Sequence, residues 1–279
     1  MKIAWIGCGV MGKAMLTHLS SEHEVCVYTR TINKAIDLKE KGIRVVESLS
    51  ECVSNAEVVF TMVGYPKDVE EVYEEIFKYA PIGSTLIDMT TSSPSLAQRL
   101  ALNTNYKVLD APVSGGDIGA INATLSIMVG GHIDDYEAML PLFKLMGTNI
   151  NYIGSAGAGQ SAKGANQIAV AGAIAAISEA IHYIHTQDLD PQVVLNAISK
   201  GAAGSWQMEH NGPKIINQDN TPGFYIKHFI KDMKIVKEAM SEHHESLNML
   251  NTVLAMYEEL AEKGYNEKGS QALISYYED

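Results

Sequence analysis

The chain has 279 residues, of which 46% are hydrophobic and 19% are charged, and its formal net charge is −12. This length exceeds one average domain, so one large domain and one smaller domain are expected. The negative charge and the lack of any lysine- or arginine-rich run argue against nucleic acid and against an anionic membrane as partners.

The first predicted element is an apolar strand, Ile3–Ile6, which leads into Gly7-Cys8-Gly9-Val10-Met11-Gly12 and a helical stretch, Val10–Leu19. With a strand before it and a helix after it, this spacing is the fingerprint of a dinucleotide site. Gly7 permits a tight turn, Gly9 lets the backbone approach a pyrophosphate, and Gly12 lets helix and strand pack closely. The free N–H groups at the helix start favour the negative charge of that pyrophosphate.

The second strand, Val25–Tyr28, ends at Thr29-Arg30-Thr31, where the adenosine ribose of a dinucleotide would lie. NAD-specific sites usually place Asp or Glu here to bind the ribose hydroxyls, and this chain has no acid at these positions. Arg30 offers a planar fork of donors suited to a 2′-phosphate, with Thr29 and Thr31 as further donors. A solvated surface arginine is the alternative. The missing acid favours NADP over NAD.

Strands and helices alternate as far as about residue 150. This alternation predicts a twisted, mostly parallel sheet with helices on both faces. The later strands are expected at Val58–Val63, Thr85–Asp88, Lys107–Ala111, Ser126–Gly130 and Asn149–Ile153, with helices at Asp68–Tyr79, Pro94–Asn103 and Ile133–Met146.

One segment in this part, Asp110–Gly116, is a candidate anion site. Its end, Ser114-Gly115-Gly116, presents a hydroxyl and backbone N–H groups with little side-chain bulk. Consecutive N–H donors form a concave site for a small anion such as a carboxylate or phosphate. An ordinary strand-to-loop turn is the alternative, and it is the better interpretation of the segment by itself. The fingerprint upstream and a lysine downstream favour a substrate site.

Beyond a small-residue segment at residues 154–159, only helical patterns follow. We therefore predict an α/β fold: a Rossmann-type, doubly wound domain over residues 1–160 and an all-α domain over residues 161–279. The expected helices of the second domain are Ser161–Thr186, Pro191–Ser199, Tyr225–His243, Leu247–Glu262 and a shorter piece near Gln271–Tyr277.

Lys163 is the one basic residue between Ser161 and Ile181, on a helix made otherwise of small and apolar residues with few polar ones. Asn166 and Gln167 lie three and four positions further on and share its face. A lysine in this setting can give a proton to a carbonyl oxygen as hydride arrives from a nicotinamide. A helix-end lysine with its head in solvent is the alternative. The polar triplet favours the catalytic interpretation.

Taken together and in order, these motifs resemble the β-hydroxyacid dehydrogenase family. That family includes 3-hydroxyisobutyrate dehydrogenase, tartronate semialdehyde reductase and glyoxylate/succinic semialdehyde reductases. The resemblance covers essentially the whole chain and is specific for the family, not for a substrate. It rests on Met11-Gly12, Asp110–Gly116, Gly119-Ala120, Thr124-Leu125, Val129-Gly130-Gly131, Lys163-x-x-Asn166 and Phe229-Ile230-Lys231-Asp232.

The resemblance implies a role for each matching residue. Lys163 would be the general acid/base, and Ser114, Gly115 and Gly116 would bind the substrate carboxylate. Asn166 or Gln167 would orient the substrate, and which of them does so stays open because many members have Asn-Asn here. Met62, Val63 and Thr91 would line the nicotinamide-ribose end of the cofactor, Lys231 would reach the cofactor, and Phe229 and Asp232 would shape the pocket.

Together with these motifs, the resemblance implies an oxidoreductase that transfers a hydride between NADP, or NAD, and a small 3-hydroxy acid or semialdehyde such as 3-hydroxyisobutyrate. An imine reductase-like enzyme is one alternative, against which Lys163 argues, because those enzymes use another proton donor. A non-catalytic NADP-binding sensor or scaffold is another. Trp206 is a candidate pocket wall or, equally, a core aromatic.

The sequence also gives expectations for the location, metal content and oligomeric state of the protein. Cys8, Cys26 and Cys52 are predicted to be free thiols, which together with the lack of a signal peptide suggests a cytoplasmic protein. The apolar stretch 168–184 is interpreted as a core helix rather than a membrane span. The nine histidines form no zinc-ligand pattern, so a metal-free site is predicted. The apolar helix and the resemblance suggest a homodimer or homotetramer.

Overall fold

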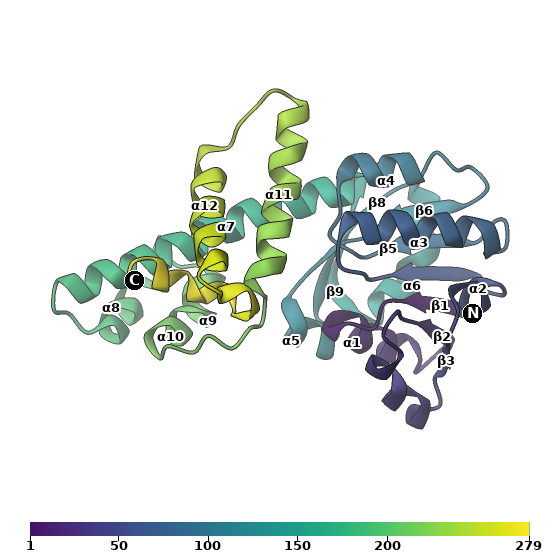
Figure 1. The fold of residues 1–279 in the computed structure, drawn as a ribbon, viewed down its shortest axis with the longest axis horizontal. Coiled ribbons are helices and arrows are strands. Elements are labelled where there is room, and N and C mark those ends of the chain that lie inside the picture. The colour runs from purple at the N-terminus through teal and green to yellow at the C-terminus, as the bar shows by residue number, and fades with distance from the viewer. Residues whose placement is uncertain (279) are drawn as a thin grey trace. The chain divides into compact units, whose positions relative to one another are not determined.

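The computed structural model describes residues 1–278, and the chain divides into two compact units, Met1–Lys163 and Gly164–Asp279. Figure 1 shows a sheet-containing first unit, coloured purple to teal, and a helical second unit, coloured green to yellow. The long helix α7 (Ala158–Thr186) begins in the first unit and continues into the second. The boundary expected after residue 160 lies in the first turn of this helix.

The first unit is built on one nine-stranded sheet (Figure 1). Strand β1 (Lys2–Ile6) pairs in parallel with the strand on each of its sides, and parallel pairing extends over six strands. Strand β8 (Leu125–Gly130) runs antiparallel to its neighbour β6 (Lys107–Asp110). The predicted doubly wound, mostly parallel Rossmann-type sheet is confirmed. The order is β3 (Arg44–Val46), β2 (Glu24–Tyr28), β1 (Lys2–Ile6), β4 (Val58–Thr61), β5 (Thr85–Asp88), β6 (Lys107–Asp110), β8 (Leu125–Gly130) and β7 (Val113–Ser114), with β9 (Gly147–Gly154) parallel to β8.

Several short elements were not predicted. Strands β3 and β7 have three and two residues, and the missed helices have five or six. Segments this short span about one period of the hydrophobic pattern, so neither alternation nor helical spacing can be recognised in them. They are the helices α2 (Leu49–Val53), α5 (Gly116–Ile121), α9 (Trp206–His210) and α10 (Gly212–Ile216).

The second unit is helical, as predicted. Its main helices after α7 are α8 (Pro191–Ile198), α11 (Ile226–Glu242) and α12 (Asn248–Glu262). The piece expected near the C-terminus is a 3₁₀ helix, Ser270–Tyr276. In the described part of this unit, β structure is limited to one isolated bridge between Tyr225 and Gly269.

Helix α7 is long and apolar enough to cross a membrane when judged by length and composition alone. That test is weak for a single helix, because the core helix of a soluble protein passes it too. Here Ile174, Ile177 and Ile181 belong to the hydrophobic core of the second unit, together with side chains from α11 and α12. These contacts place one side of α7 in the core of this unit, and 33% of its most apolar 18-residue stretch is buried.

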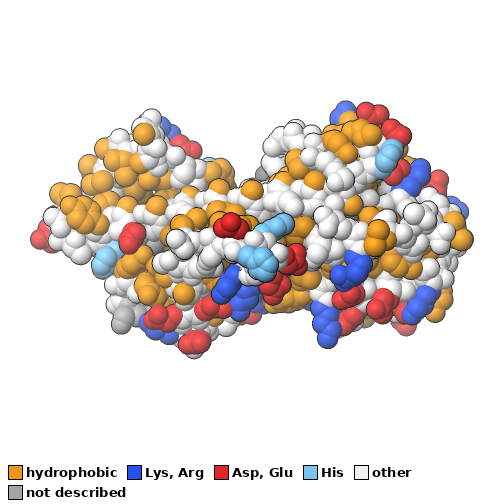
Figure 2. All heavy atoms as spheres, turned by 90° about the horizontal axis from the view of Figure 1, so that it is seen from above, with side chains coloured by type: hydrophobic (Ala, Val, Ile, Leu, Met, Phe, Trp, Pro, Cys, Tyr) orange, Lys and Arg blue, Asp and Glu red, His pale blue; other side chains and the backbone are white. Residues whose placement is uncertain are grey.

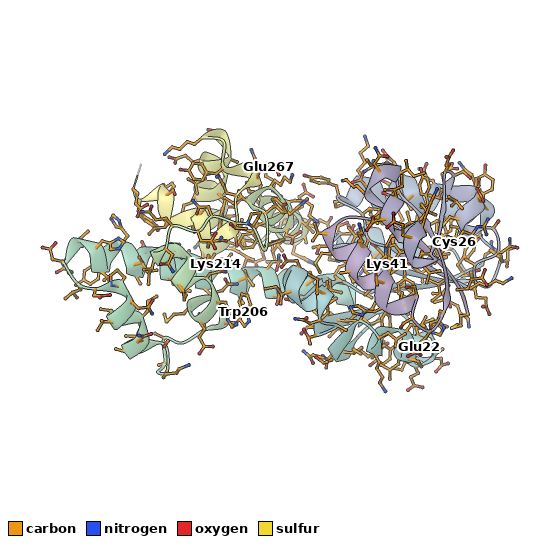
Figure 3. The ribbon with its side chains drawn as sticks, turned by 90° about the horizontal axis from the view of Figure 1, so that it is seen from below. Glu22, Cys26, Lys41, Trp206, Lys214 and Glu267 are labelled. Atoms are coloured by element: carbon orange, nitrogen blue, oxygen red, sulfur yellow. The ribbon has the colours of Figure 1, made fainter. Side chains whose placement is uncertain are left out.

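Part of the helical unit's surface is apolar. Figure 2 shows hydrophobic side chains gathered over this unit, at the left of the view. Trp206, labelled in Figure 3, is 60% exposed and stacks on His210, with 4.1 Å between ring centroids. The suggestion that Trp206 is a core aromatic is therefore wrong. The other large exposed apolar residues of this unit are Tyr183, Leu189, Val193 and Met249.

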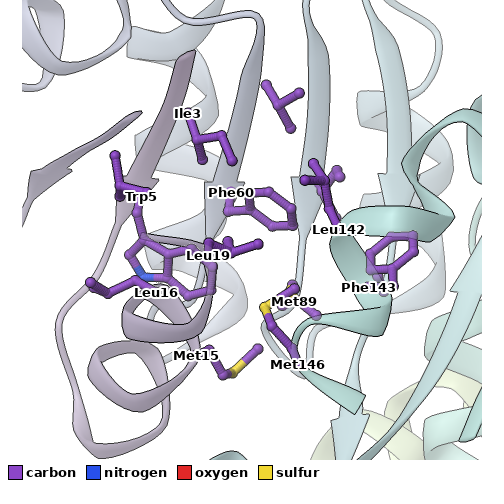
Figure 4. Close-up of a cluster of buried hydrophobic side chains, with 14 of the residues drawn as sticks. Ile3, Trp5, Met15, Leu16, Leu19, Phe60, Met89, Leu142, Phe143 and Met146 are labelled. Atoms are coloured by element: carbon purple, nitrogen blue, oxygen red, sulfur yellow. The ribbon is translucent and has the colours of Figure 1, made fainter. Parts of the chain in front are cut away.

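The sheet of the first unit has a hydrophobic core on each face. Because successive side chains of a strand point to opposite faces, Trp5 joins one core and Ile6 the other. On the Trp5 side, α1 (Val10–Leu19) and α6 (Ile133–Lys144) cover the sheet, as Figure 4 shows for the side chains around Trp5 and Phe60. On the other side lie α2, α3 (Pro66–Tyr79) and α4 (Pro94–Leu100). Cys8, Cys26 and Cys52 are free, as predicted.

Candidate functional site

Five of the predicted site segments meet at one edge of the sheet. Parallel strands that are neighbours in a sheet end at the same edge, and ligands of such sheets bind there, where the strand order reverses. In this sheet the reversal falls at β1, which lies between β2 and β4. The segments that follow β1, β2, β4, β5 and β6 are Gly7–Gly12, Thr29–Thr31, Met62-Val63, Thr91 and Asp110–Gly116.

The geometry of the glycine turn suits a dinucleotide. Gly7 has φ +101°, and its N–H donates to the carbonyl of Tyr28 at 2.9 Å. A Cβ on Gly7 would overlap the carbonyl oxygen of Met62, and one on Gly12 would overlap that of Gly7. At Gly9, by contrast, a Cβ would have nothing within 4 Å. Backbone N–H groups at the start of α1 thus border open space, which is where a pyrophosphate would lie.

The remaining residues of the fingerprint differ in exposure. Val10 is 63% exposed, whereas Cys8 is buried and directs its Sγ toward the carbonyl oxygen of Lys34 at 3.6 Å. Burial is the main cause that raises the pKa of the Cys8 thiol. Any contact of Cys8 with a cofactor would therefore run through its backbone.

Arg30 has an ion-pair partner that the sequence analysis did not identify. Its Nη2 lies 2.7 Å from Oδ1 of Asp68, and the Arg30 side chain is 68% exposed whereas that of Asp68 is 15% exposed. The other oxygen of Asp68 accepts from the N–H of Tyr65 at 2.9 Å in the capping box of α3. The guanidinium is thus held beside the end of β2, and a 2′-phosphate would compete with Asp68 for it.

The ends of β4 and β5 are joined through a buried carboxylate. Oδ1 of Asp88 accepts from the Thr61 hydroxyl at 2.7 Å and from the Thr90 N–H at 3.1 Å. The Thr90 hydroxyl in turn accepts from the N–H of Val63 at 3.0 Å. Burial raises the pKa of Asp88 to about 6 although these hydrogen bonds favour the charged form. The network holds the loops that carry Val63 and Thr91 against each other.

Asp88→Asn is expected to stabilise the protein above pH 6. A carboxyl whose pKa is raised on folding favours the fold while it is protonated, and that advantage is lost as pH rises through about 6. A rise of the Asp88 pKa from 3.8 to about 6 corresponds to about 3 kcal/mol as an upper bound. An asparagine oxygen can still accept from Thr61 and Thr90, so the variant keeps the bonds without the charge. Urea unfolding at pH 5 and pH 8 should show a gain that is larger at pH 8.

Asp110→Asn is the matched control for this measurement. Both oxygens of Asp110 accept backbone N–H groups, so its amide nitrogen would face a donor. The gain at pH 8 should be clearly smaller than for Asp88→Asn. Equal gains, or no gain for Asp88→Asn, would contradict the argument.

Asp110 connects the anion-site segment to the helix that carries Lys163. Its two carboxylate oxygens accept from the N–H groups of Gly157 and Gln160, each at 2.8 Å. These donors belong to the start of α7, where unpaired N–H groups need acceptors. Burial raises the pKa of Asp110 to about 6, against the effect of these donors. Lys163 follows one turn later and is 7% exposed.

The anion-site turn itself is strand-like at one end and left-handed at the other. Ser114 ends β7 and pairs with Ser126 of β8. Gly115 and Gly116 follow with φ of +132° and +63°, and α5 begins at Gly116. Ser114 and Gly116 are half-buried and Gly115 is exposed. Gly115 and Gly116 add no side-chain bulk to the turn, and a Cβ on Gly115 would lie 3.2 Å from Cδ2 of Leu125.

In the second unit, four predicted residues form one chain of contacts. The Asn166 amide donates to Oε1 of Gln167 at 2.8 Å, and the Gln167 amide donates to Oδ2 of Asp232 at 2.6 Å. Nζ of Lys231 lies 3.0 Å from Oδ1 of Asp232. Gln167 and Asp232 are 2% and 3% exposed, whereas Asn166 is half-buried.

Phe229, the fifth predicted residue of this unit, is a core residue. It is fully buried and packs against Phe224 and Tyr257, at 5.4 Å and 5.2 Å between ring centroids. This burial leaves Phe229 only an indirect part in shaping a pocket. Within residues 1–278, no group of three or more His, Cys, Asp or Glu side chains is arranged to hold a metal ion.

Two family models match the chain in succession. The NAD-binding domain of 6-phosphogluconate dehydrogenase matches residues 2–154, more than half of the chain. The NAD-binding domain of NADP-dependent 3-hydroxyisobutyrate dehydrogenase matches residues 157–277.

Individual proteins are also similar to this chain over nearly its whole length. The chain is 46% identical to an uncharacterized oxidoreductase of Bacillus subtilis, over 99% of this chain and 98% of that one. It is 36% identical to the 2-hydroxy-3-oxopropionate reductase of Escherichia coli, over 100% and 97%. A Mycobacterium tuberculosis 3-hydroxyisobutyrate dehydrogenase structure with L-serine has a TM-score of 0.91, 28% identity and 98% coverage of both chains. The chain therefore belongs to the β-hydroxyacid dehydrogenase family and is an NAD(P)-dependent oxidoreductase that acts on the CH–OH group of hydroxy acids.

Proposed function

We propose that this enzyme interconverts a small 3-hydroxy acid and its semialdehyde, such as 3-hydroxyisobutyrate, with NADP as the preferred cofactor. The observation that carries the proposal is the Ser114-Gly115-Gly116 turn beside the carboxyl edge of the sheet. The compounds in the relatives' names support it: 3-hydroxyisobutyrate, 2-hydroxy-3-oxopropionate and L-serine all have a carboxylate and an oxygen on C3.

The proposed mechanism assigns separate tasks to the turn and to Lys163. The bound nicotinamide supplies or accepts the hydride. The Ser114 hydroxyl and the backbone N–H groups of Gly115 and Gly116 hold the carboxylate, which fixes the position of C3. Nζ of Lys163 gives a proton to the alkoxide oxygen in reduction and removes it in oxidation. The 7% exposure of Lys163 limits competition from bulk water for this proton.

The hydrogen bonds of the second unit favour Asn166 as the amide that orients the substrate. Both polar atoms of the Gln167 side chain are engaged, its oxygen with Asn166 and its nitrogen with Asp232. In the contact with Gln167, Asn166 uses its nitrogen as the donor, and its side chain is only half-buried. Gln167 would then hold Asn166 in place.

A substrate panel tests the function. Oxidation of 3-hydroxyisobutyrate, L-serine and a 3-hydroxy acid amide should be followed at 340 nm, together with reduction of 2-hydroxy-3-oxopropionate. The acids should turn over and the amide should not, because the turn binds a carboxylate. Ser114→Ala should raise KM for the acids by about 10- to 100-fold, the effect of losing a hydrogen bond to a charged group. Equal turnover of acid and amide would overturn the proposal.

Arg30→Met is expected to weaken NADPH binding by about 10- to 100-fold, because the hydrogen bonds to a charged 2′-phosphate are lost. NADH affinity should stay within about threefold of the wild-type value, since NADH lacks that phosphate. Titration of the cofactor's fluorescence measures both.

Arg99→Met is the matched control for the cofactor test. Arg99 also pairs with a carboxylate of α3, that of Glu70, and its side chain is 56% exposed. Its replacement should change neither affinity. If Arg30→Met weakens both cofactors equally, the preference for NADP does not come from Arg30.

We also propose a cellular location and an oligomeric state for the enzyme. Free cysteines and a nucleotide-dependent activity suit a cytoplasmic protein. The exposed apolar side chains of the second unit, visible in Figure 2, suit a homodimer or homotetramer. Light scattering of the purified protein measures the number of subunits.

An imine reductase-like activity is less well supported, because Lys163 is present where those enzymes have another proton donor.

A further inference from the structure

We propose that Gln160 is a positioning residue that sets the location of Lys163 relative to the cofactor-lining loops. The proposal rests on the proposed role of Lys163 as the proton donor. Gln160 lies in the first turn of α7, three residues before Lys163, so the two side chains lie on the same side of the helix one turn apart.

The side chain of Gln160 is a buried bridge to the loop after β5. Its Nε2 donates to the carbonyl of Thr90 at 2.7 Å, and its Oε1 accepts from the N–H of Ser92 at 2.9 Å. The residue is 2% exposed. The two contacts lie on either side of Thr91, the residue predicted to line the nicotinamide-ribose end of the cofactor. One amide thus clamps the backbone around Thr91.

The backbone of Gln160 is held just as firmly. Its N–H donates to Oδ2 of Asp110 at 2.8 Å, while Gly157, which precedes the helix, has no side chain with which to cap it. Asp110 therefore replaces the usual N-cap side chain from another part of the chain. A Cβ on Gly159 would lie 2.9 Å from Oδ2 of Asp110, so the small residue there leaves room for this contact.

Hydrogen bonds also connect the loop after β5 to the loop after β4. The hydroxyl of Thr90 accepts from Val63, so the loops after β4 and β5 and the start of α7 form one hydrogen-bonded group. All of these residues lie in the first unit. A shift of the helix start relative to Thr91 would displace Lys163, and a displacement of about 1 Å in an active site costs about 10²-fold in rate.

Gln160→Met tests the proposal, because methionine matches the length of glutamine and makes neither hydrogen bond. We expect kcat to fall about 10- to 100-fold while the cofactor Kd changes less than about threefold. Gln192→Met, the same change at an exposed glutamine of α8, should leave kcat unchanged. Gln160→Glu keeps the acceptor for Ser92 but places a carboxylate oxygen where the amide donates to Thr90, so its kcat should fall at least as far as that of Gln160→Met. It carries the test if Gln160→Met does not fold.

A double-mutant cycle with Lys163→Ala separates positioning from a merely structural role. If Gln160 acts through Lys163, its replacement should cost little further rate once the lysine is gone. An equal loss in both backgrounds, or an unchanged kcat in the single variant, would overturn the inference. An unchanged kcat in Lys163→Ala alone would instead refute the proposed role of the lysine.

Discussion

Replacing Lys163 by alanine should lower kcat by about 10²- to 10⁴-fold, the usual contribution of a positioned proton donor. Lys163 lies in α7 and is 7% exposed, so a proton donor from bulk water has little access to the position of its amine. Cofactor binding should persist, because the glycine turn proposed to hold the pyrophosphate follows β1 and is not part of α7. Steady-state rates at 340 nm and fluorescence titration of the cofactor measure the two effects separately.

Lys163→Met is the companion variant, since it keeps the length and the helix propensity of lysine without a proton. It should be as inactive as Lys163→Ala and at least as stable. A primary amine added to Lys163→Ala should restore part of the rate, whereas the same amine should not help Lys163→Met, in which the space is filled. More than about a tenth of the wild-type kcat in both variants would show that another group supplies the proton.

Gly9→Val should leave the fold stable and weaken NADP(H) binding at least about tenfold, or about 1.4 kcal/mol. A Cβ at Gly9 has nothing within 4 Å, and its φ of −75° and ψ of −175° are accessible to valine. The added side chain would therefore occupy the space that a pyrophosphate needs and disturb little else. Thermal unfolding and cofactor titration should separate the two properties.

Gly12→Ala gives the opposite pattern and serves as the contrast. Its Cβ would overlap the Gly7 carbonyl oxygen and lie 3.2 Å from Nε1 of Trp5, so the fold itself should lose stability. If Gly9→Val binds the cofactor as tightly as the wild type, the pyrophosphate does not lie over Gly9, and the interpretation of the fingerprint is wrong.

The long elements could be predicted because their patterns are local. Helix α1 begins and ends where the glycine fingerprint and the apolar spacing placed it, at Val10–Leu19. Strand β5 also has the expected bounds, Thr85–Asp88. Helix α7 was expected to begin at Ser161 but begins at Ala158, because its first turn is capped by Asp110, 47 residues before Gly157 in the sequence. No local signal reveals a cap of that kind.

The partners of the site residues could not be predicted for the same reason. Arg30 was interpreted as a free donor for a phosphate, yet Asp68 of α3 holds it. Gln167 and Asp232 were assigned to the substrate, yet they bind each other. The sequence left open whether Asn166 or Gln167 faces the substrate. The hydrogen bond between Gln167 and Asp232, which are 65 positions apart, is what favours Asn166.

The sequence by itself determined the family, the order of the motifs and the types of residue at the site, because each is carried by a short stretch with its own spacing. Only the tertiary structure decided how those stretches are joined. Asp88 and Asp110 are buried, and Gln160 bridges to the loop around Thr91. Burial and hydrogen bonding depend on which strands end side by side, and that is a property of the folded sheet rather than of any one segment.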